Sequence, residues 1–167
     1  RSSQRTPAGT VDVAVAGDFV AYRTDSGTVF AGRLSSGEPT QLDPNAAEED
    51  ATHYTAETIA VDADGVVYSY SSVEKVVLSY RITSSEVIAS DAVENAPTGS
   101  DLRITAIGGR WVMVDPADDG RLWMRERSMA LRTIGAVAVQ RPGPKADVAY
   151  VADEAGLMEG PLDGGLP

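Results

Sequence analysis

The stretch "IAVDADGVVYSYSSVEKVVLSYRI", residues 59 to 82, decides the fold. Its apolar residues recur with period two in short runs separated by Asp, Gly and Ser, which is the pattern of antiparallel strands joined by tight turns. Val66, Tyr68 and Tyr70 share one face of the middle run, and the other face carries Val and Ser rather than charge. Strands that are apolar or small on both faces predict a sheet packed on both sides.

The same pattern occurs four times along the chain. The repeats start at residues 13, 59, 104 and 137, which gives spacings of 46, 45 and 33 residues. Each repeat contains an apolar strand, a turn, a second strand, a polar turn and a third strand. The first three repeats add a fourth short segment, at 40–43, 86–90 and 130–135. A period of about 40 to 50 residues with four short strands is typical of a β-propeller blade.

The sequence therefore predicts an all-β protein, a β-propeller-like array of about three and a half to four blades of antiparallel four-stranded sheets that is part of a larger propeller. No window shows a sustained helical stripe, so we expect at least about twelve strands and no α-helix longer than about two turns. The predicted parts are a lead-in at 1–10, repeats over 11–160 with blades at approximately 11–43, 57–94, 101–135 and 136–160, and a tail or linker at 161–167.

The turn between the first and second strands of a repeat falls at Asp18, Gly65 and Gly109. Asp and Gly tolerate the positive φ that tight hairpins require, so these residues are expected to adopt it.

An open array leaves the faces of its end blades uncovered. No strand precedes the first blade, so its apolar residues are expected to be exposed. These residues are Val11, Val13, Val15, Phe19, Val20 and Tyr22. The exposed blade edges predict a protein partner or self-association, with the alternative that the 43–57 segment folds over the open face.

Composition excludes several classes of function. The chain has 167 residues, 43% of them hydrophobic, which is enough for one domain with a core. A net charge of −11 disfavours nucleic acid as a partner. No apolar stretch approaches the roughly 20 residues that span a bilayer, so no membrane insertion by this segment is expected. Cysteine is absent, which excludes disulfides, a thiol nucleophile and a Cys-based zinc site.

Two segments carry a resemblance to a known family. "GRLSSGEPTQLD" (32–43) and "AIGGRWVMVDPADDGRLW" (106–123) resemble segments of the propeller-like region that precedes the fibronectin type III modules of actinobacterial surface proteins. The resemblance covers much of residues 11–135, and its motifs are mostly strand and turn residues. It implies a cell-surface, extracellular location and no catalytic residues. The Trp-Asp and kelch signatures are absent, and the chain does not contain the fibronectin modules.

The chain begins at Arg1 rather than Met, so we expect upstream residues, including a membrane anchor, to be missing from this segment.

The acidic turn "DPADDG" (115–120) raises the question of calcium, with Asp115, Asp118 and Asp119 as candidate ligands. A twelve-residue calcium loop needs Asp-x-Asp-x-Asp-Gly and a Glu six residues after the glycine. The first spacing is wrong here, although Glu126 does lie six residues beyond Gly120. We interpret the turn as a hairpin in which Asp side chains bond their own backbone, and expect no metal or other cofactor.

Catalytic patterns are weak. His53 is the single histidine and lies in the polar segment that joins the first two repeats. A serine triad or a histidine metal site would need partners from elsewhere in the fold. The acidic residues Glu48, Glu49, Asp50 and Glu57 are interpreted as solubilising charge rather than as a glycosidase pair.

The aromatic residues leave a glycan as an alternative ligand. Residues in predicted strands are expected to fill the space between blades rather than to stack on sugars. They are Trp111, Trp123, Tyr68, Tyr70 and Tyr80. Tyr54 lies in a loop, and with His53 it is the candidate interaction surface.

The sequence favours a non-enzymatic extracellular propeller module that acts as a scaffold or protein-interaction platform of a bacterial surface protein. The alternative is a glycan-binding or glycan-hydrolysing propeller. A glycan function needs an exposed aromatic side chain beside carboxylates in a groove, whereas a scaffold needs only packed blades.

Stability is expected to be nearly indifferent to calcium, because the acidic turn lacks the ligand spacing of a tight site. Thermal unfolding curves measured in calcium and in chelator should agree within about 3 °C, whereas a shift above about 10 °C would assign the ion to Asp115, Asp118 or Asp119.

Overall fold

The computed structural model describes residues 5–42, 54–93, 102–107 and 109–115, together with the strands at 121–124, 127–129, 138–139, 148–153 and 156–161; side chains are described as far as Met113, except that of Ile107. All regular secondary structure in these residues is β-strand, and all strand pairs are antiparallel. The predictions of an all-β fold and of antiparallel sheets are confirmed.

The strands form four sheets, each a meander in chain order. The first contains β1 (Thr10–Ala16), β2 (Phe19–Thr24), β3 (Val29–Arg33) and β4 (Ser36–Leu42). The second contains β5 (Thr58–Val61), β6 (Val66–Ser71), β7 (Val76–Arg81) and β8 (Glu86–Ala92). The third contains β9 (Arg103–Ile107), β10 (Arg110–Asp115), β11 (Arg121–Met124) and β12 (Arg127–Met129). The fourth has three strands, β13 (Ala138–Val139), β14 (Val148–Asp153) and β15 (Gly156–Pro161).

The fourth strand of the third sheet lies earlier in the chain than the repeat pattern predicted. The repeat pattern placed it at 130–135, whereas β12 covers Arg127–Met129 and pairs with β11 from Leu122 to Met124. The pattern could not separate the two positions because apolar residues occur in both segments. Residues 130–135 lie outside the described part of the chain.

Glycine supplies the positive φ of the first hairpin turn in each of the first three sheets. Gly65 and Gly109 adopt φ values of +79° and +74°, as predicted. In the first sheet the residue with positive φ is Gly17, at +57°, and not Asp18. Asp18 instead accepts hydrogen bonds through its carboxylate from the backbone N–H and hydroxyl of Ser35, at 3.0 and 2.6 Å. These bonds tie the β1–β2 turn to the β3–β4 turn.

The second sheet is packed on both faces. Toward the first sheet, its buried residues Val67, Leu78 and Tyr80 share a core cluster with Phe19 and Leu42. This burial of both faces confirms the prediction made from the period-two runs.

The other face of the second sheet packs against the third. Its residues Tyr68, Tyr70 and Val77 share a second core cluster with Trp111 and Met113. Two polar contacts accompany the apolar packing between these sheets. The Trp111 Nε1–H donates to Asp91 Oδ2 at 2.9 Å, and the Ile104 N–H donates to Thr58 Oγ1 at 3.3 Å.

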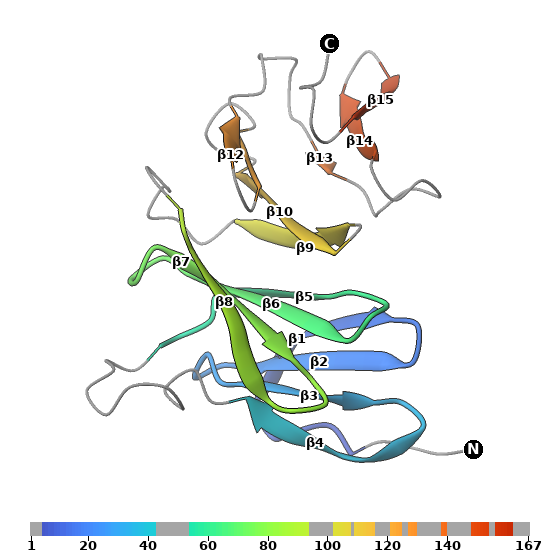
Figure 1. Ribbon diagram of the computed structural model, residues 1–167, viewed down its shortest axis with the longest axis vertical. Helices are drawn as coiled ribbons and strands as arrows, with labels where there is room; N and C mark the ends of the chain where they lie inside the picture. Colours follow the sequence, from blue (N-terminus) through green and yellow to red (C-terminus); the bar gives the residue numbers. More distant parts are fainter. Residues whose placement is uncertain are drawn as a thin grey trace.

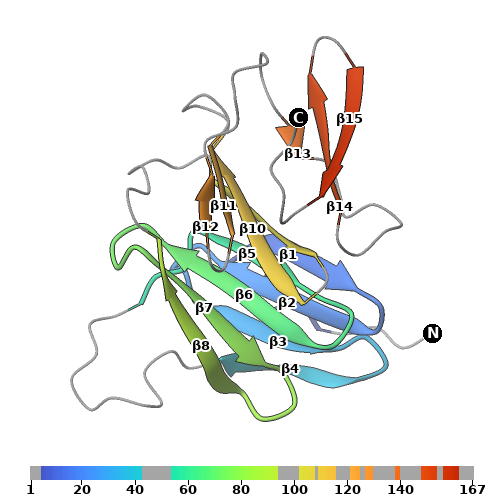
Figure 2. The same cartoon turned by 45° about the horizontal axis from the view of Figure 1, so that its top comes forward.

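The first strands of successive sheets lie side by side, since β1 contacts β5 and β5 contacts β9. Figure 1 shows the sheets following one another along the molecule, with β1–β4 at one end and β13–β15 toward the other, and Figure 2 shows the β5–β8 sheet lying over the β1–β4 sheet. The described strands form four separate sheets and no closed ring of strands.

The first sheet is less exposed than predicted. Val11, Val13 and Val15 on β1 are exposed as expected. Phe19, Val20 and Tyr22 on β2 were expected to share this exposure, and all three are buried. Phe19 packs between the first two sheets. The other two lie on the same face as the exposed valines, since Val20 pairs with Val15 and Tyr22 with Val13, and this face is covered over β2 but not over β1.

Replacement of Gly65 by alanine is expected to destabilise the fold by about 2–5 kcal/mol. Alanine is disfavoured at this φ, and its Cβ would lie 2.7 Å from Phe19 Cζ, a ring packed in the core. The control is Gly17→Ala, where φ is also positive but no atom lies within 4 Å of the new Cβ. It should cost only about 1–2 kcal/mol in denaturant unfolding. Equal costs would show that the Phe19 contact contributes nothing.

Candidate functional site

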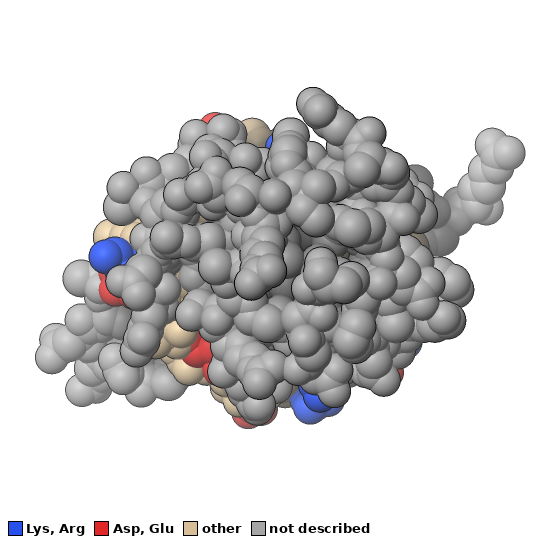
Figure 3. Space-filling model, turned by 90° about the horizontal axis from the view of Figure 1, so that it is seen from above, with Lys and Arg blue, Asp and Glu red and all other residues tan. Residues whose placement is uncertain are grey.

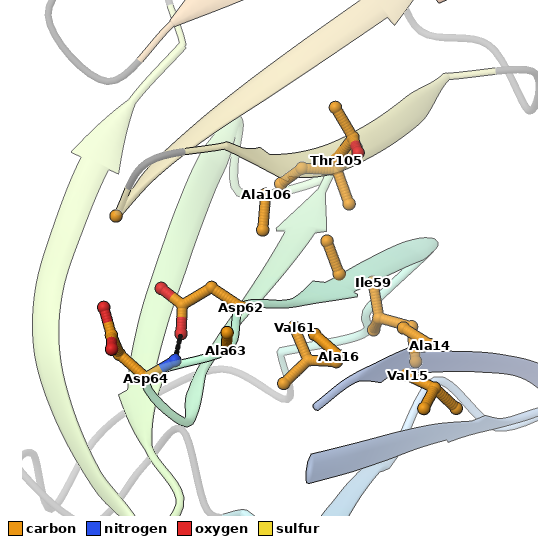
Figure 4. Close-up of a pocket in the computed structure, with 13 residues that line it drawn as sticks. Ala14, Val15, Ala16, Ile59, Val61, Asp62, Ala63, Asp64, Thr105 and Ala106 are labelled. Atoms are coloured by element: carbon orange, nitrogen blue, oxygen red, sulfur yellow. Dashed lines mark hydrogen bonds between the residues drawn. The ribbon is translucent and has the colours of Figure 1, made fainter. Parts of the chain in front are cut away.

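A groove runs between the first strands of the first three sheets, with a volume of about 510 Å³. Figure 4 shows its residues coming from β1, β5 and β9 and from the turn after β5. The lining consists of Ala14, Val15, Ala16, Ile59, Ala60, Val61, Asp62, Ala63, Asp64, Ile104, Thr105, Ala106 and Gly109. Small side chains predominate, so the groove exists because alanine and glycine leave space between strands that would otherwise be filled.

Two carboxylates, Asp62 and Asp64, stand at one end of this groove (Figure 4). Asp62 is buried and already bonded within the fold. Its Oδ1 accepts from the backbone N–H groups of Asp64 and Val66, at 3.0 and 2.9 Å, and its Oδ2 accepts from the Tyr68 hydroxyl at 3.1 Å. Asp62 thus holds the β5–β6 turn, and Asp64 is the exposed acid. A glycosidase needs two available carboxyl groups, and the lining offers one.

The exposed valines of β1 form the second feature of this region. Val11, Val13 and Val15, here called the valine face, alternate with Ala14 and Ala16, which pack toward the second sheet. Because successive side chains of a strand point to opposite sides, the valine face points away from the second sheet. Its members are 56%, 51% and 57% exposed.

Repeat-equivalent positions in the next sheets are buried. In the four-repeat alignment, Val13 and Val15 correspond to Ile59 and Val61. Those two residues are only 5% and 6% exposed, because the first sheet covers them. Along β1 the valine face is therefore the same surface without a covering sheet, whereas Val20 and Tyr22, which pair with two of its valines, are buried.

Four of the aromatic side chains named from the sequence are in the core, as predicted. Tyr68, Tyr70, Tyr80 and Trp111 are each at most 1% exposed. They offer no stacking surface for a sugar. Trp123 lies on β11, and its side chain is outside the described part of the structure.

Tyr54, one of the two candidate interaction residues, is partly buried and bonded to the second sheet. Its hydroxyl donates to the Ser69 carbonyl at 2.7 Å and lies 3.0 Å from the Ser69 hydroxyl. Burial raises the pKa of the Tyr54 hydroxyl well above its usual value. The tyrosine therefore anchors the segment before β5. The other candidate, His53, lies outside the described residues.

Tyr70 carries a buried hydroxyl that has no hydrogen-bond partner among the described residues. Burial, and secondarily the charge of Glu57, raise its pKa to about 12. Glu57, interpreted from the sequence as solubilising charge, accepts a hydrogen bond from the Ser72 hydroxyl. Because the folded pKa of Tyr70 lies above its unfolded value of about 10, stability is unaffected at neutral pH and falls as pH rises from about 10 toward 12.

The candidate calcium ligands can be placed only in part. Asp115 is the last residue of β10 and pairs with Arg121, the first residue of β11, so the chain reverses between them. Asp118 and Asp119 lie outside the described residues. Within the described part, no group of three His, Cys, Asp or Glu side chains is arranged to hold a metal ion.

The described charged side chains that can be seen in Figure 3 stand in small groups. Figure 3 shows separate basic and acidic groups along the margin of one face, with no continuous patch of either sign among the described residues visible there. Two ion pairs lie on the first sheet, Arg23–Asp12 at 3.8 Å and Arg33–Asp18 at 3.5 Å. The Ser35 bonds, more than Arg33, lower the pKa of Asp18.

Comparison with known proteins finds a shared fold but no family. Neither a protein-family model nor a curated protein sequence matches this chain. The crystal structure of the computationally designed Ika8 protein is similar, with a TM-score of 0.60 and 12% identity. That similarity covers 94% of this chain and 47% of the designed one, so the chain spans about half the length of the structure it matches. In all, 402 chains of solved structures match, and a fold this widespread does not specify an activity.

No helix in the described residues is long and apolar enough to cross a bilayer.

Two tyrosines of β6 allow a matched test of the buried polar groups. Tyr68→Phe removes a hydroxyl bonded to the Asp62 carboxylate and is expected to cost about 1.5–3 kcal/mol. Tyr70→Phe removes the hydroxyl without a partner and is expected to leave stability unchanged or to raise it by up to about 1 kcal/mol. Urea unfolding at neutral pH measures both. A loss for Tyr70→Phe as large as that for Tyr68→Phe would mean that the Tyr70 hydroxyl has a partner.

Proposed function

We propose that this chain is a non-enzymatic interaction module, built as a propeller-like array of sheets, that binds a protein through the valine face. The observation that carries the proposal is the difference in exposure between repeat-equivalent residues. Val13 and Val15 are 51% and 57% exposed, whereas Ile59 and Val61 are 5% and 6% exposed. A surface that the rest of the fold covers with another sheet is the natural place for a partner.

Burial of the valine face would contribute a modest, favourable free energy of binding. Full burial of a valine side chain is worth about 1.5 kcal/mol or more, so covering the exposed halves of three valines contributes roughly 2–4 kcal/mol. Exposed apolar residues scattered singly need no explanation, but three that follow one another on one strand face form a stripe. Within β1 the residues between the valines, Asp12 and Ala14, point to the other side.

The propeller-like architecture is supported by the order of the strands. Each of the first three sheets is a four-stranded antiparallel meander, and the first strands of successive sheets are neighbours. Central placement of the first strands is how propeller blades are arranged.

The extracellular setting is supported by the resemblance of residues 32–43 and 106–123 to a region of actinobacterial surface proteins. In such a protein the module would be a scaffold or interaction platform, anchored through a segment outside this sequence.

The chemistry of the groove favours binding over catalysis. Its lining is mainly alanine, valine and isoleucine, with Thr105 as the hydroxyl and Asp64 as the exposed acid. Neither a base beside the threonine nor a second free carboxylate is present among the lining residues. General acid–base and nucleophilic mechanisms both need such a pair.

Photo-crosslinking tests the proposed surface. The photoreactive residue p-benzoylphenylalanine is placed at position 13, and in a control protein at position 73, where Val73 is 76% exposed in the β6–β7 turn. With extract of the source organism present, we expect a protein adduct from position 13 and little from position 73. Equal yields at the two positions, or none at position 13, would contradict the proposal.

The glycan alternative has its own check. A glycan array and a hydrolase screen are expected to show neither binding nor turnover, because Tyr68, Tyr70, Tyr80 and Trp111 are buried in the core and cannot stack on a sugar. Micromolar binding to one sugar class would replace the protein partner with a carbohydrate.

A further inference from the structure

The contact between the first and second sheets shows what kind of surface would fit the valine face. Where the first sheet covers the second, Ala14, Ala16 and Phe19 of the first sheet pack over Ile59 and Val61 of the second. The covering side of a sheet is thus made of small residues and one aromatic ring. Since the valine face repeats the character of the covered side, its complement is the covering side of another sheet of the same kind.

The array also has a last sheet, β13–β15, which lies at the opposite end from β1–β4 (Figure 1). One end of the molecule therefore presents the exposed valine stripe of β1. The other end presents a further antiparallel sheet. The two ends are different surfaces, so an association through them joins the head of one copy to the tail of another.

The length of the similar designed protein supports an assembly of two copies of this chain. This chain superposes with 94% of its length on only 47% of a longer protein of similar fold. In that structure the chain continues for about one further length of this chain. Two copies of this chain would match its whole length.

We infer that the partner of the valine face is a second copy of this chain, with the last sheet of each copy covering the valine face of the other in a two-fold symmetric dimer. The inference rests on the proposed function, because it names the partner of the same surface. Two equivalent contacts close the assembly, so it stops at two copies and does not grow into a filament.

Charge sets a further requirement on this dimer. Each copy carries a net charge of −11, so two copies repel each other over distances longer than the contact itself. Salt shortens that repulsion, and the Debye length falls from about 10 Å at 0.1 M to about 3 Å at 1 M. The apolar contact is not weakened by salt. The dimer should therefore become tighter as salt is added, opposite to an association held by ion pairs.

Sedimentation equilibrium of the purified chain tests the inference. We expect a reversible equilibrium between a 17.5 kDa monomer and a species of twice that mass, with a dissociation constant that falls as sodium chloride rises. Val13→Asp should raise that constant at least about tenfold, because it places a charge in the contact. Val73→Asp is the matched control. It is the same substitution at an exposed valine outside the valine face, and it should leave the dissociation constant unchanged.

Circular dichroism first establishes that both variants keep the strand content of the parent. If Val13→Asp fails to fold, cross-linking from p-benzoylphenylalanine at position 13 of the purified protein provides the second measurement. Mass spectrometry is expected to place the adduct within residues 138–161 of a second copy. An adduct within residues 10–24 would mean that two valine faces meet each other, and would overturn the head-to-tail arrangement.

A monomer at every protein and salt concentration, with no adduct from the purified chain, would overturn the second copy as partner. The proposed function would then be judged separately, from cross-linking in extract. An adduct between position 13 and a different protein would support the proposed interaction surface but not the second copy as partner. Absence of any adduct in extract would contradict both proposals.

Discussion

The structure depends on one constraint, the apolar character of both faces of the second sheet. A sheet with one polar face can rest against a single layer, but Leu78 and Tyr80 on one side and Tyr68 and Tyr70 on the other cannot all be buried by one neighbour. The chain meets this constraint by placing a sheet on each side. The stacked order of the array follows from the alternation of residues along β6 and β7, and no helix is needed to cover either face.

Close approach of the sheets depends on small residues at their first strands. Ala14 lets β1 lie beside β5, and Ala60 lets β5 lie beside β9. Gly65 leaves room for the Phe19 ring between the first two sheets. Polar groups then fix the register of the turns. The Asp18 carbonyl accepts from the Leu34 N–H at 2.7 Å, and the Gly65 carbonyl accepts from the Ile82 N–H at 3.0 Å, so the first and last turns of a sheet are tied in two successive repeats.

Much of this fold could be read from the sequence, because alternation and repeat spacing are local signals. They predicted the strands, the antiparallel sheets and the burial of Tyr68 and Trp111. They could not predict the groove, whose strands β1, β5 and β9 are distant in the chain, or the bond from Tyr54 to Ser69, which fixes a side chain that loop composition left free. The exposure expected for Tyr22 was wrong for a related reason, since position within a sheet decides burial and composition alone does not.

The same constraint explains why the exposed surface is a narrow stripe. Burial of Val20 and Tyr22 on β2 narrows the exposed apolar surface beside β1. Three half-exposed valines are far less than the roughly 800 Å² that each partner buries in a stable complex, so a partner must extend beyond them. The adjoining surface is the groove, because Val15 belongs to both. A partner that covers the valine face therefore also reaches the mouth of the groove, and the two surfaces act as one binding region.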